Sequence, residues 1–130
     1  MNAALLLGVE HRSELDLALA VREGLPAGTI ETFAERSGLT RDEIARVLDL
    51  ANGSLPGDKL SEGQSDRLVR LAEVLSQAAD VLGDLKSGVA WLRRAHIELG
   101  DRAPLELLSN EQGGITARKI LMRAAHGIPV

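Results

Sequence analysis

Apolar residues recur along most of this chain at the three- and four-residue spacing of an α-helix. The clearest run lies between residues 62 and 82, where Leu68, Leu71, Ala72 and Leu75 fall on one helical face. The strict alternation of apolar and polar residues that marks a half-buried β-strand is missing. The pattern therefore predicts an all-α fold.

Capping residues divide this periodic pattern into separate helices. Ser13 is a candidate N-cap, and the pairs Thr40–Glu43 and Ser61–Gln64 have the spacing of a capping box. Glycines follow several segments, as expected of the residue that most readily closes a helix. The expected helices span approximately residues 13–24, 28–37, 40–48, 62–82, 89–99, 104–108 and 114–125. In the first of them, the residues expected to face inward are Leu15, Leu17, Ala18 and Val21.

Two segments are not covered by strong helical periodicity. The run AALLLGV at residues 3–9 is too short to span a bilayer and has no basic residue before it, as a signal peptide would. We expect it to be a flexible or partner-packed start. Residues 51–65 are rich in glycine, serine and proline and are the expected joint between two parts of the chain. The expected division is 1–58 and 59–130.

One pair of the expected helices has the spacing of a helix-turn-helix. In the stretch AERSGLTRDEIARVLDL, residues 34–50, Ala34 is small enough for the next helix to cross close by. Gly38 permits a turn with a positive φ angle, and Ile44 and Val47 would hold the second helix against the first. Helix pairs with a glycine turn also occur in many other all-α proteins, so the motif alone leaves a purely structural role open.

DNA contacts would come from the outer face at the start of the second helix, which enters the major groove in this motif. Arg41 or Arg46 could bind a guanine through two hydrogen bonds, and Arg36 could meet a phosphate. The candidate DNA-binding residues are Arg36, Thr40, Arg41, Glu43, Ala45 and Arg46.

The charge of the chain argues against strong DNA binding by a single protomer. It has 19 acidic and 15 basic residues, a net charge of −4, whereas neutralisation of phosphates supplies much of the affinity for DNA. A dimer or a partner would have to make up the deficit. Phe33 and Trp91 are the only aromatic residues, which disfavours a single-strand or RNA binder built on base stacking. The absence of cysteine suits a reducing, cytoplasmic location.

No residues are spaced as a catalytic or metal-binding set. His11, His96 and His126 are far apart and have no second ligand at helical spacing. The pair Gly113-Gly114 is not followed by the lysine and hydroxyl residue of a phosphate-binding loop, and no serine lies in a nucleophile elbow. We therefore expect no enzyme activity, no cofactor and no metal.

The second half of the chain carries an ordered set of short motifs. Residues 60–84 read LSEGQSDRLVRLAEVLSQAADVLGD, followed by AWL at 90–92, LGDRAPLELLSNEQG at 99–113 and the ending AAHGIPV. Each piece alone has little specificity, but the set in this order and spacing resembles the MbcA/ParS/Xre antitoxin family. These proteins are the antitoxins of RES–Xre toxin–antitoxin pairs, and the resemblance covers approximately residues 28–130.

The resemblance implies an all-α protein with an N-terminal Xre-like helix-turn-helix followed by a C-terminal helical toxin-binding domain. It implies a homodimer that binds the operator DNA of its own operon as a repressor. The implied partner is a RES-domain toxin, which resembles ADP-ribosyltransferases and degrades NAD⁺. In this family the C-terminal end of the antitoxin blocks the entrance to the toxin's active site.

The basic C-terminal segment is the expected toxin-binding surface. No acidic residue follows Glu111, so this segment is locally positive, and its cations can pair with carboxylates of the toxin. Ser109 and Arg118 depart from the threonine and the acidic residue that are more usual at these places in the family. The expected toxin-binding residues are Arg118, Lys119, Arg123, His126, Gly127, Ile128, Pro129 and Val130.

Two other interpretations stay open beside the antitoxin. A stand-alone helix-turn-helix regulator without a toxin partner would tolerate the loss of residues 124–130. An adaptor dimer with a degenerate helix-turn-helix would have no DNA binding to lose when Arg41 and Arg46 are replaced by alanine. The ordered motifs of the second half favour the antitoxin over both.

Overall fold

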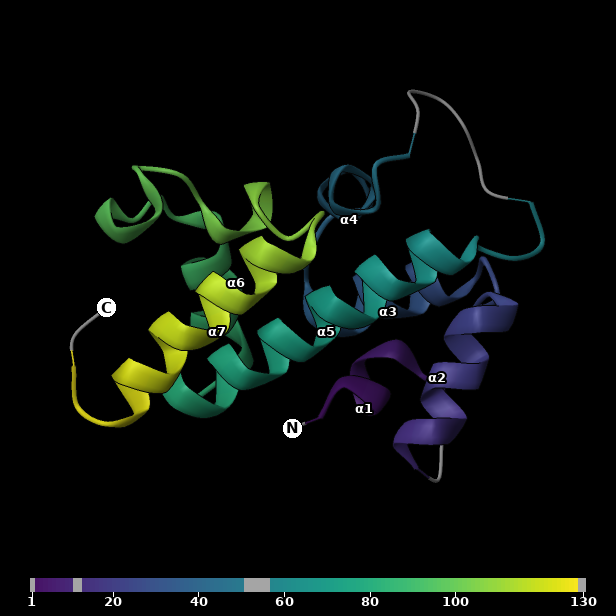
Figure 1. The fold of residues 1–130 in the computed structure, drawn as a ribbon, viewed down its shortest axis with the longest axis horizontal. Helices are drawn as coiled ribbons and strands as arrows, with labels where there is room; N and C mark the ends of the chain where they lie inside the picture. Colours follow the sequence, from purple (N-terminus) through teal and green to yellow (C-terminus); the bar gives the residue numbers. More distant parts are fainter. Residues whose placement is uncertain (1, 11–12, 51–56, 129–130) are drawn as a thin grey trace.

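The computed structural model describes residues 2–10, 13–50 and 57–128, and these residues form helices joined by turns (Figure 1). Within them there is no β-strand, only two isolated bridges, Pro26 with Lys59 and His96 with Arg102. The all-α prediction is therefore confirmed. The α-helices are α1 (Ala3–Leu7), α2 (Glu14–Glu23), α3 (Thr29–Ser37), α4 (Arg41–Leu48), α5 (Glu62–Leu82), α6 (Leu85–Arg93) and α7 (Glu111–Ala125), and the 3-10 helices are η1 (Ile97–Leu99) and η2 (Pro104–Glu106).

The long helix α5 is the central element of the fold, with its bounds as predicted (Figure 1). Its start is fixed by the expected capping box: Gln64 N donates to Ser61 Oγ at 3.0 Å, and Ser61 N donates to Gln64 Oε1 at 2.8 Å. Helices α1, α2, α4, α6 and α7 all contact it. The predicted apolar face is buried, with Leu68, Leu71 and Leu75 fully enclosed. The helix thus provides one core surface for both halves of the chain.

Several predicted boundaries in the second half need correction. Helix α6 begins at Leu85, before the expected start. It ends at Arg93 and does not continue to Gly100, because the backbone is already extended at Arg94 and the chain then turns through η1. The helix expected over 104–108 is the shorter 3-10 helix η2. Helix α7 begins at Glu111, three residues earlier than expected, and Asn110 caps it. Gly113 lies in this first turn against the η2 segment, where a Cβ would come within 1.8 Å of the Leu107 carbonyl oxygen. Close backbone packing therefore explains this glycine.

The expectation of a flexible or partner-packed start is wrong. Residues 3–7 form α1, which Asn2 caps by accepting a hydrogen bond from Leu5 N at 2.9 Å. Leu6 and Leu7 are each 2% exposed, and the helix packs on α3 and α5 of the same chain. The segment is therefore part of the core.

The expected inward face of α2 is also wrong in part. Leu15 is 66% exposed and Ala18 is exposed, whereas Leu17 and Val21 pack partly buried against the core. None of the ten residues of α2, all of them within the described part of the chain, is fully buried. The helix packs on α5 along one side only, and its other side faces solvent.

The residues just before α5 are tied to those that follow α2. Residues 51–56 of the expected joint lie outside the described residues. Beyond them, Leu60 N donates to Leu25 O at 2.8 Å and Ala27 N donates to Asp58 O at 3.0 Å. A single hydrophobic cluster contains buried residues of both halves. The division at 58/59 stays a prediction, and no gap in the core marks it.

Candidate functional site

Helices α3 and α4 form the predicted helix-turn-helix. Gly38 has φ +86° at the turn, as expected. Ile44 and Val47 are buried on the inner face of α4. The second capping box is complete, with Glu43 N donating to Thr40 Oγ1 at 3.1 Å and Thr40 N donating to Glu43 Oε1 at 2.9 Å. The scaffold that the spacing predicts is confirmed.

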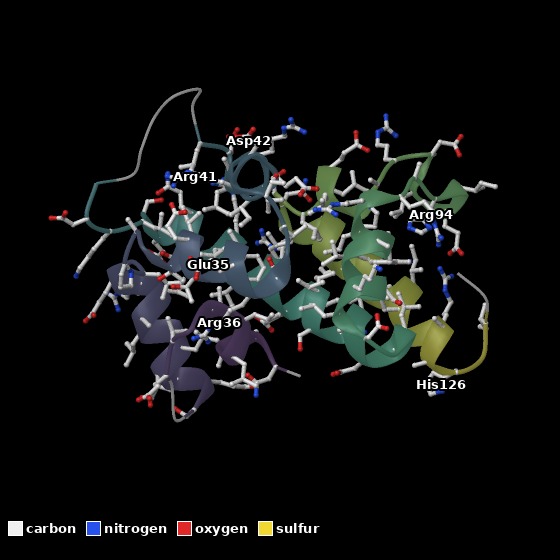
Figure 2. The ribbon with its side chains drawn as sticks, turned by 180° about the vertical axis from the view of Figure 1, so that it is seen from behind. Glu35, Arg36, Arg41, Asp42, Arg94 and His126 are labelled. Atoms are coloured by element: carbon white, nitrogen blue, oxygen red, sulfur yellow. The ribbon has the colours of Figure 1, made fainter. Side chains whose placement is uncertain are left out.

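The outer face of α4 is polar, and its charges are nearly balanced. Thr40, Arg41 and Arg46 are exposed and Ala45 is partly buried. Arg41 forms an ion pair with Glu31 of α3, and its side chain keeps 46% of its surface exposed. Figure 2 shows Arg41 and Asp42 side by side in the upper part of the view. These four candidates therefore share one accessible surface, where acidic side chains offset the arginines.

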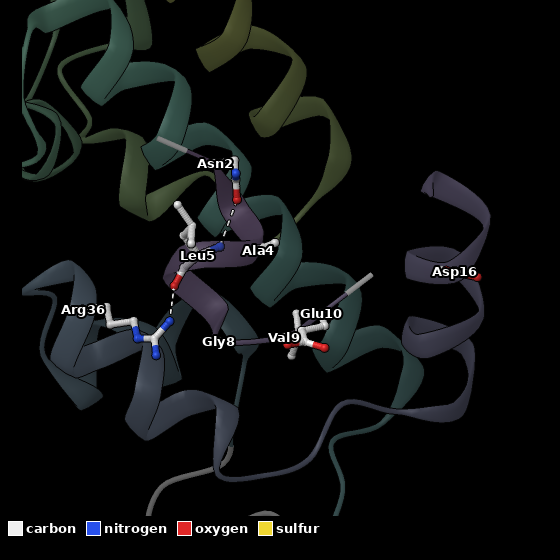
Figure 3. A pocket seen from close by; sticks show the side chains of 8 residues that line it. All are labelled: Asn2, Ala4, Leu5, Gly8, Val9, Glu10, Asp16 and Arg36. Carbon is white, nitrogen blue, oxygen red and sulfur yellow. Dashed lines mark hydrogen bonds between the residues drawn. The ribbon is translucent and has the colours of Figure 1, made fainter. Parts of the chain in front are cut away.

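Arg36 has a different position from the other candidates. Its Nη1 donates to the carbonyl oxygen of Leu5 at 2.5 Å, which fastens α1 onto α3 (Figure 3). Figure 2 shows its side chain well apart from Arg41, towards α1. The structure thus separates Arg36 from the outer face of α4 and gives it a structural contact that no local pattern predicts.

Glu43 is held by an arginine from the second half of the chain. Arg93 Nη2 and Nε donate to the two Glu43 carboxylate oxygens at 2.8 and 2.9 Å, and Nη2 also donates to Gly38 O at 3.2 Å. These hydrogen bonds from Arg93 lower the pKa of the Glu43 carboxyl from 4.5 to about 2. A two-point carboxylate–guanidinium pair also fixes orientation. Arg93 therefore holds both the turn and α4 against α6, while base contact by Glu43 stays a prediction.

The SDRL motif at residues 65–68 joins three parts of the fold. Ser65 is fully buried and accepts a hydrogen bond from Leu25 N at 2.9 Å. Arg67 donates to Leu48 O at the end of α4 (3.2 Å) and to Ser109 O (3.0 Å). Asp66 pairs with Arg70 one turn on, at 2.6 Å. Each residue of the motif therefore has a structural partner, and Leu68 lies in the core.

The basic residues of α7 are spread around the helix. Arg118 pairs with Glu73 of α5 at 3.3 Å, and Arg123 pairs with Glu98 of η1. Lys119 and His126 are exposed. In Figure 2, His126 lies at the end of the molecule remote from Arg41. Two of the predicted toxin contacts thus already have carboxylate partners within the chain.

The end of α7 has a defined backbone conformation up to Ile128. Gly127 has φ +87°, its N–H donates to Ala124 O at 3.0 Å, and Ile128 N donates to Arg123 O at 3.0 Å. These two bonds are those of a Schellman motif. They turn the chain at Gly127 and leave the Ile128 side chain 50% exposed. Pro129 and Val130, the last predicted contacts, lie outside the described residues.

In the part of the chain that the structure describes, no group of three His, Asp or Glu side chains could hold a metal ion, and no helix is both long and apolar enough to cross a membrane. His96 points inward: its Nε2 lies 3.0 Å from Trp91 O, and the two rings pack in a tilted arrangement, with centroids 5.1 Å and planes 39° apart. Trp91 is 2% exposed and belongs to the core. His11 lies outside the described residues.

Comparison with known proteins divides the chain into two consecutive matches. Residues 16–73 match the family model of the antitoxin Xre-like helix-turn-helix domain. Residues 77–127 match the model of the antitoxin Xre/MbcA/ParS C-terminal toxin-binding domain. The change from one match to the other falls within α5.

A curated relative agrees with this assignment. The chain is 27% identical over 127 residues to a protein named antitoxin Xre from Pseudomonas putida, and the match covers 95% of this chain and 80% of the relative. The expected order of domains is thus found both in the family models and in the fold. The chain belongs to the Xre/MbcA/ParS antitoxin family, with a helix-turn-helix domain followed by a toxin-binding domain.

Proposed function

We propose that this protein neutralises a RES-type, NAD⁺-degrading toxin by direct binding and represses its own operon through the helix-turn-helix. The observation that carries the proposal is the order of the two matches, an Xre-like helix-turn-helix over residues 16–73 and a toxin-binding domain over 77–127. The protein acts by occlusion and not by catalysis. Its place of action is the cytoplasm, where operator DNA and NAD⁺ are found together.

The C-terminal end is the part that blocks the toxin. Lys119, His126, Gly127 and Ile128 are exposed, so these residues are accessible to a cleft of the toxin. Arg118 and Arg123 contribute by exchanging their intramolecular carboxylates for those of the toxin. A segment held by a Schellman motif loses less conformational freedom on binding than an unstructured end does.

Operator binding is proposed for a homodimer. The outer face of α4 offers Thr40, Arg41, Ala45 and Arg46 to the major groove, but one such face with a balanced charge gives little electrostatic attraction to DNA. Two copies related by a two-fold axis would present two recognition helices to the half-sites of an operator, as helix-turn-helix dimers do. The deficit of positive charge is then offset by the number of contacts.

Induction of the neighbouring reading frame tests the proposal. Cellular NAD⁺ and growth are measured when that frame is expressed alone, with this protein, and with a variant that lacks residues 124–130. NAD⁺ should fall in the first culture, recover in the second and fall again in the third. A neighbour that never lowers NAD⁺ would contradict the proposal and favour a free-standing regulator.

A further inference from the structure

One exposed side chain stands out in the toxin-binding domain. Ile97 is 88% exposed, the highest value among the large hydrophobic residues that the structure describes. A single exposed apolar residue is ordinary, so its surroundings decide whether it means anything. Two more exposed apolar side chains belong to the same domain end, Met122 at 59% and Ile128 at 50%.

These three residues lie at one end of the fold, where α7 ends. Arg123 pairs with Glu98, so the residues that neighbour this ion pair in sequence, Met122 and Ile97, lie at the same end of the fold. Ile128 joins them because its N–H donates to Arg123 O at 3.0 Å. We call Ile97, Met122 and Ile128 the apolar end. In Figure 1 the η1 segment and the C-terminal segment lie at the same extremity of the molecule.

The loop that carries Ile97 is rigidly built. Residues 96–102, the Ile97 loop, are closed by the bridge between His96 and Arg102, with His96 N donating to Arg102 O at 3.1 Å. Gly100 and Asp101 are consecutive residues with positive φ, +65° and +60°. Leu99 anchors the loop with 7% exposure, and the ring of His96 packs at a tilt against buried Trp91. The loop is thus fixed before any partner arrives.

A non-glycine residue with positive φ is uncommon and usually costs conformational energy. In the Ile97 loop that cost maintains a shape that holds an isoleucine side chain in water. A rigidly held apolar side chain lowers the ordering cost of association, because neither the backbone nor a β-branched side chain has much freedom to lose. This combination fits a protein surface and not DNA, since Glu98 and Asp101 belong to the same loop and would repel phosphates.

We propose that the Ile97 loop is a second contact for the toxin, which binds the apolar end as a whole together with the C-terminal segment. The inference rests on the proposed function and adds to it a surface remote in sequence from the blocking end. The toxin is the partner that we assign to this surface for two reasons. Ile97 and Met122 lie within the matched toxin-binding domain, which ends at residue 127, and Ile128 belongs to the proposed blocking segment. The matching toxin surface is an apolar hollow beside its active-site entrance.

The test compares two aspartate substitutions of exposed apolar residues in otherwise full-length protein. Ile97→Asp places a charge on the proposed contact. Leu15→Asp is the matched control, because Leu15 is 66% exposed on α2 and an acidic residue in the first turn of a helix is well tolerated. The dissociation constant for the purified product of the neighbouring reading frame is measured for both, with thermal midpoints and molar mass in solution.

We expect Ile97→Asp to raise the dissociation constant by about ten- to a hundredfold, as loss of one buried isoleucine implies, and Leu15→Asp to leave it within about twofold. Both should keep the wild-type thermal midpoint and mass. Equal affinity of the two variants, with wild-type protein still binding, would overturn the second contact alone. A mass halved by Ile97→Asp with unchanged toxin affinity would assign the surface to a second copy and overturn it too. Failure of wild-type protein to bind at all would overturn the proposed function itself.

Discussion

The outer face of α4 and the C-terminal end of the molecule offer different chemistry to solvent. On α4 the exposed residues are polar or charged, and the described residues of that helix include no exposed large hydrophobic side chain. At the other end, Ile97, Met122 and Ile128 are exposed among charged neighbours. A polyanion is recognised through hydrogen bonds and cations, whereas protein interfaces take their affinity from desolvated apolar anchors. The two surfaces therefore suit two different classes of partner.

The two surfaces also differ in how their charges are held. Glu43 and Arg93 form a two-point pair close to the turn of the helix-turn-helix, with Glu43 only 19% exposed. At the C-terminal end, Arg118 and Glu73 are each about 40% exposed, and such exposed pairs are worth little individually. The contacts of α4 thus define an orientation, while those of α7 can be exchanged for a partner's groups at small cost.

The strongest test of the comparison removes residues 124–130. We expect toxin neutralisation to be abolished, because the blocking segment and Ile128 are lost together. Operator affinity should stay within about twofold, since Arg41 of α4 lies well apart from His126 (Figure 2). Gel shifts at defined salt and growth rescue measure the two activities. Full rescue by the shortened protein would show that the C-terminal end does not block the toxin.

A second test concerns the close packing of the first turn of α7 against the backbone of Leu107. Gly113→Ala should lower the free energy of unfolding by about 2–3 kcal/mol, because the new methyl overlaps the backbone of Leu107 and forces a shift of a packed helix. Gly63→Ala is the control: it is also in the first turn of a long helix, but its Cβ would meet only side-chain atoms at 3.8 Å or beyond. That change should be neutral or stabilise by up to about 1 kcal/mol. Urea titrations give both values, and equal effects would contradict the tight contact.

A third test breaks the polar surface alone. Arg41→Ala and Arg46→Ala should each weaken operator binding by about 1–3 kcal/mol if the guanidinium reaches a base edge, and toxin binding should not change. Arg22→Ala on α2 is the control, as an exposed arginine outside the recognition helix. Affinities of all three variants are compared at one ionic strength. An operator affinity that none of them alters would remove these residues from the DNA interface.

The smallest expected effect concerns the Arg93–Glu43 pair. Arg93→Ala should destabilise the protein by about 1–2 kcal/mol, because Arg93 is 44% exposed and solvent screens part of the interaction. Arg94→Ala, an exposed neighbour, serves as control. The same pair makes stability depend on pH. The pKa of the Glu43 carboxyl falls from 4.5 to about 2 on folding. Glu43 therefore stabilises the folded protein fully above pH 4.5, and this contribution is lost as the pH falls towards 2.

Glu43→Gln isolates the charge in that experiment. Glutamine still completes the capping box, so only the negative charge is lost. The variant should therefore be less stable at neutral pH, and its free energy of unfolding should fall less on acidification than that of the wild type. Chemical unfolding at several pH values between 2 and 7 measures the slope. Parallel slopes for the two proteins would mean that Glu43 titrates with its ordinary pKa.

Local patterns predicted the parts of the fold that depend on neighbours in sequence. The bounds of α5, the two capping boxes and the positive φ of Gly38 follow from residues within a few positions of each other. Helix α1 was missed because five residues are too few to display a helical period. The face of α2 was misjudged because periodicity cannot tell how many neighbours a helix will have.

The site was less predictable than the fold for a related reason. Arg36 meets a carbonyl 31 positions earlier, and Arg93 meets a carboxylate 50 positions earlier, and nothing in the local sequence marks such partners. The exposure of Ile97 could not be predicted either, because an isoleucine within a helical pattern is expected to be buried in the core. Its exposure depends on the end of α6 at Arg93 and on the two positive φ angles that follow.

The course of α5 has a consequence for how such proteins can be recombined. One uninterrupted helix serves as the last element of the DNA-reading match and the first of the toxin-binding match. A chimera that joins the first half of one relative to the second half of another must splice inside this helix and rebuild its contacts with α4 and α7 at once. The specificities of the two matched domains are therefore more easily inherited together than exchanged between relatives.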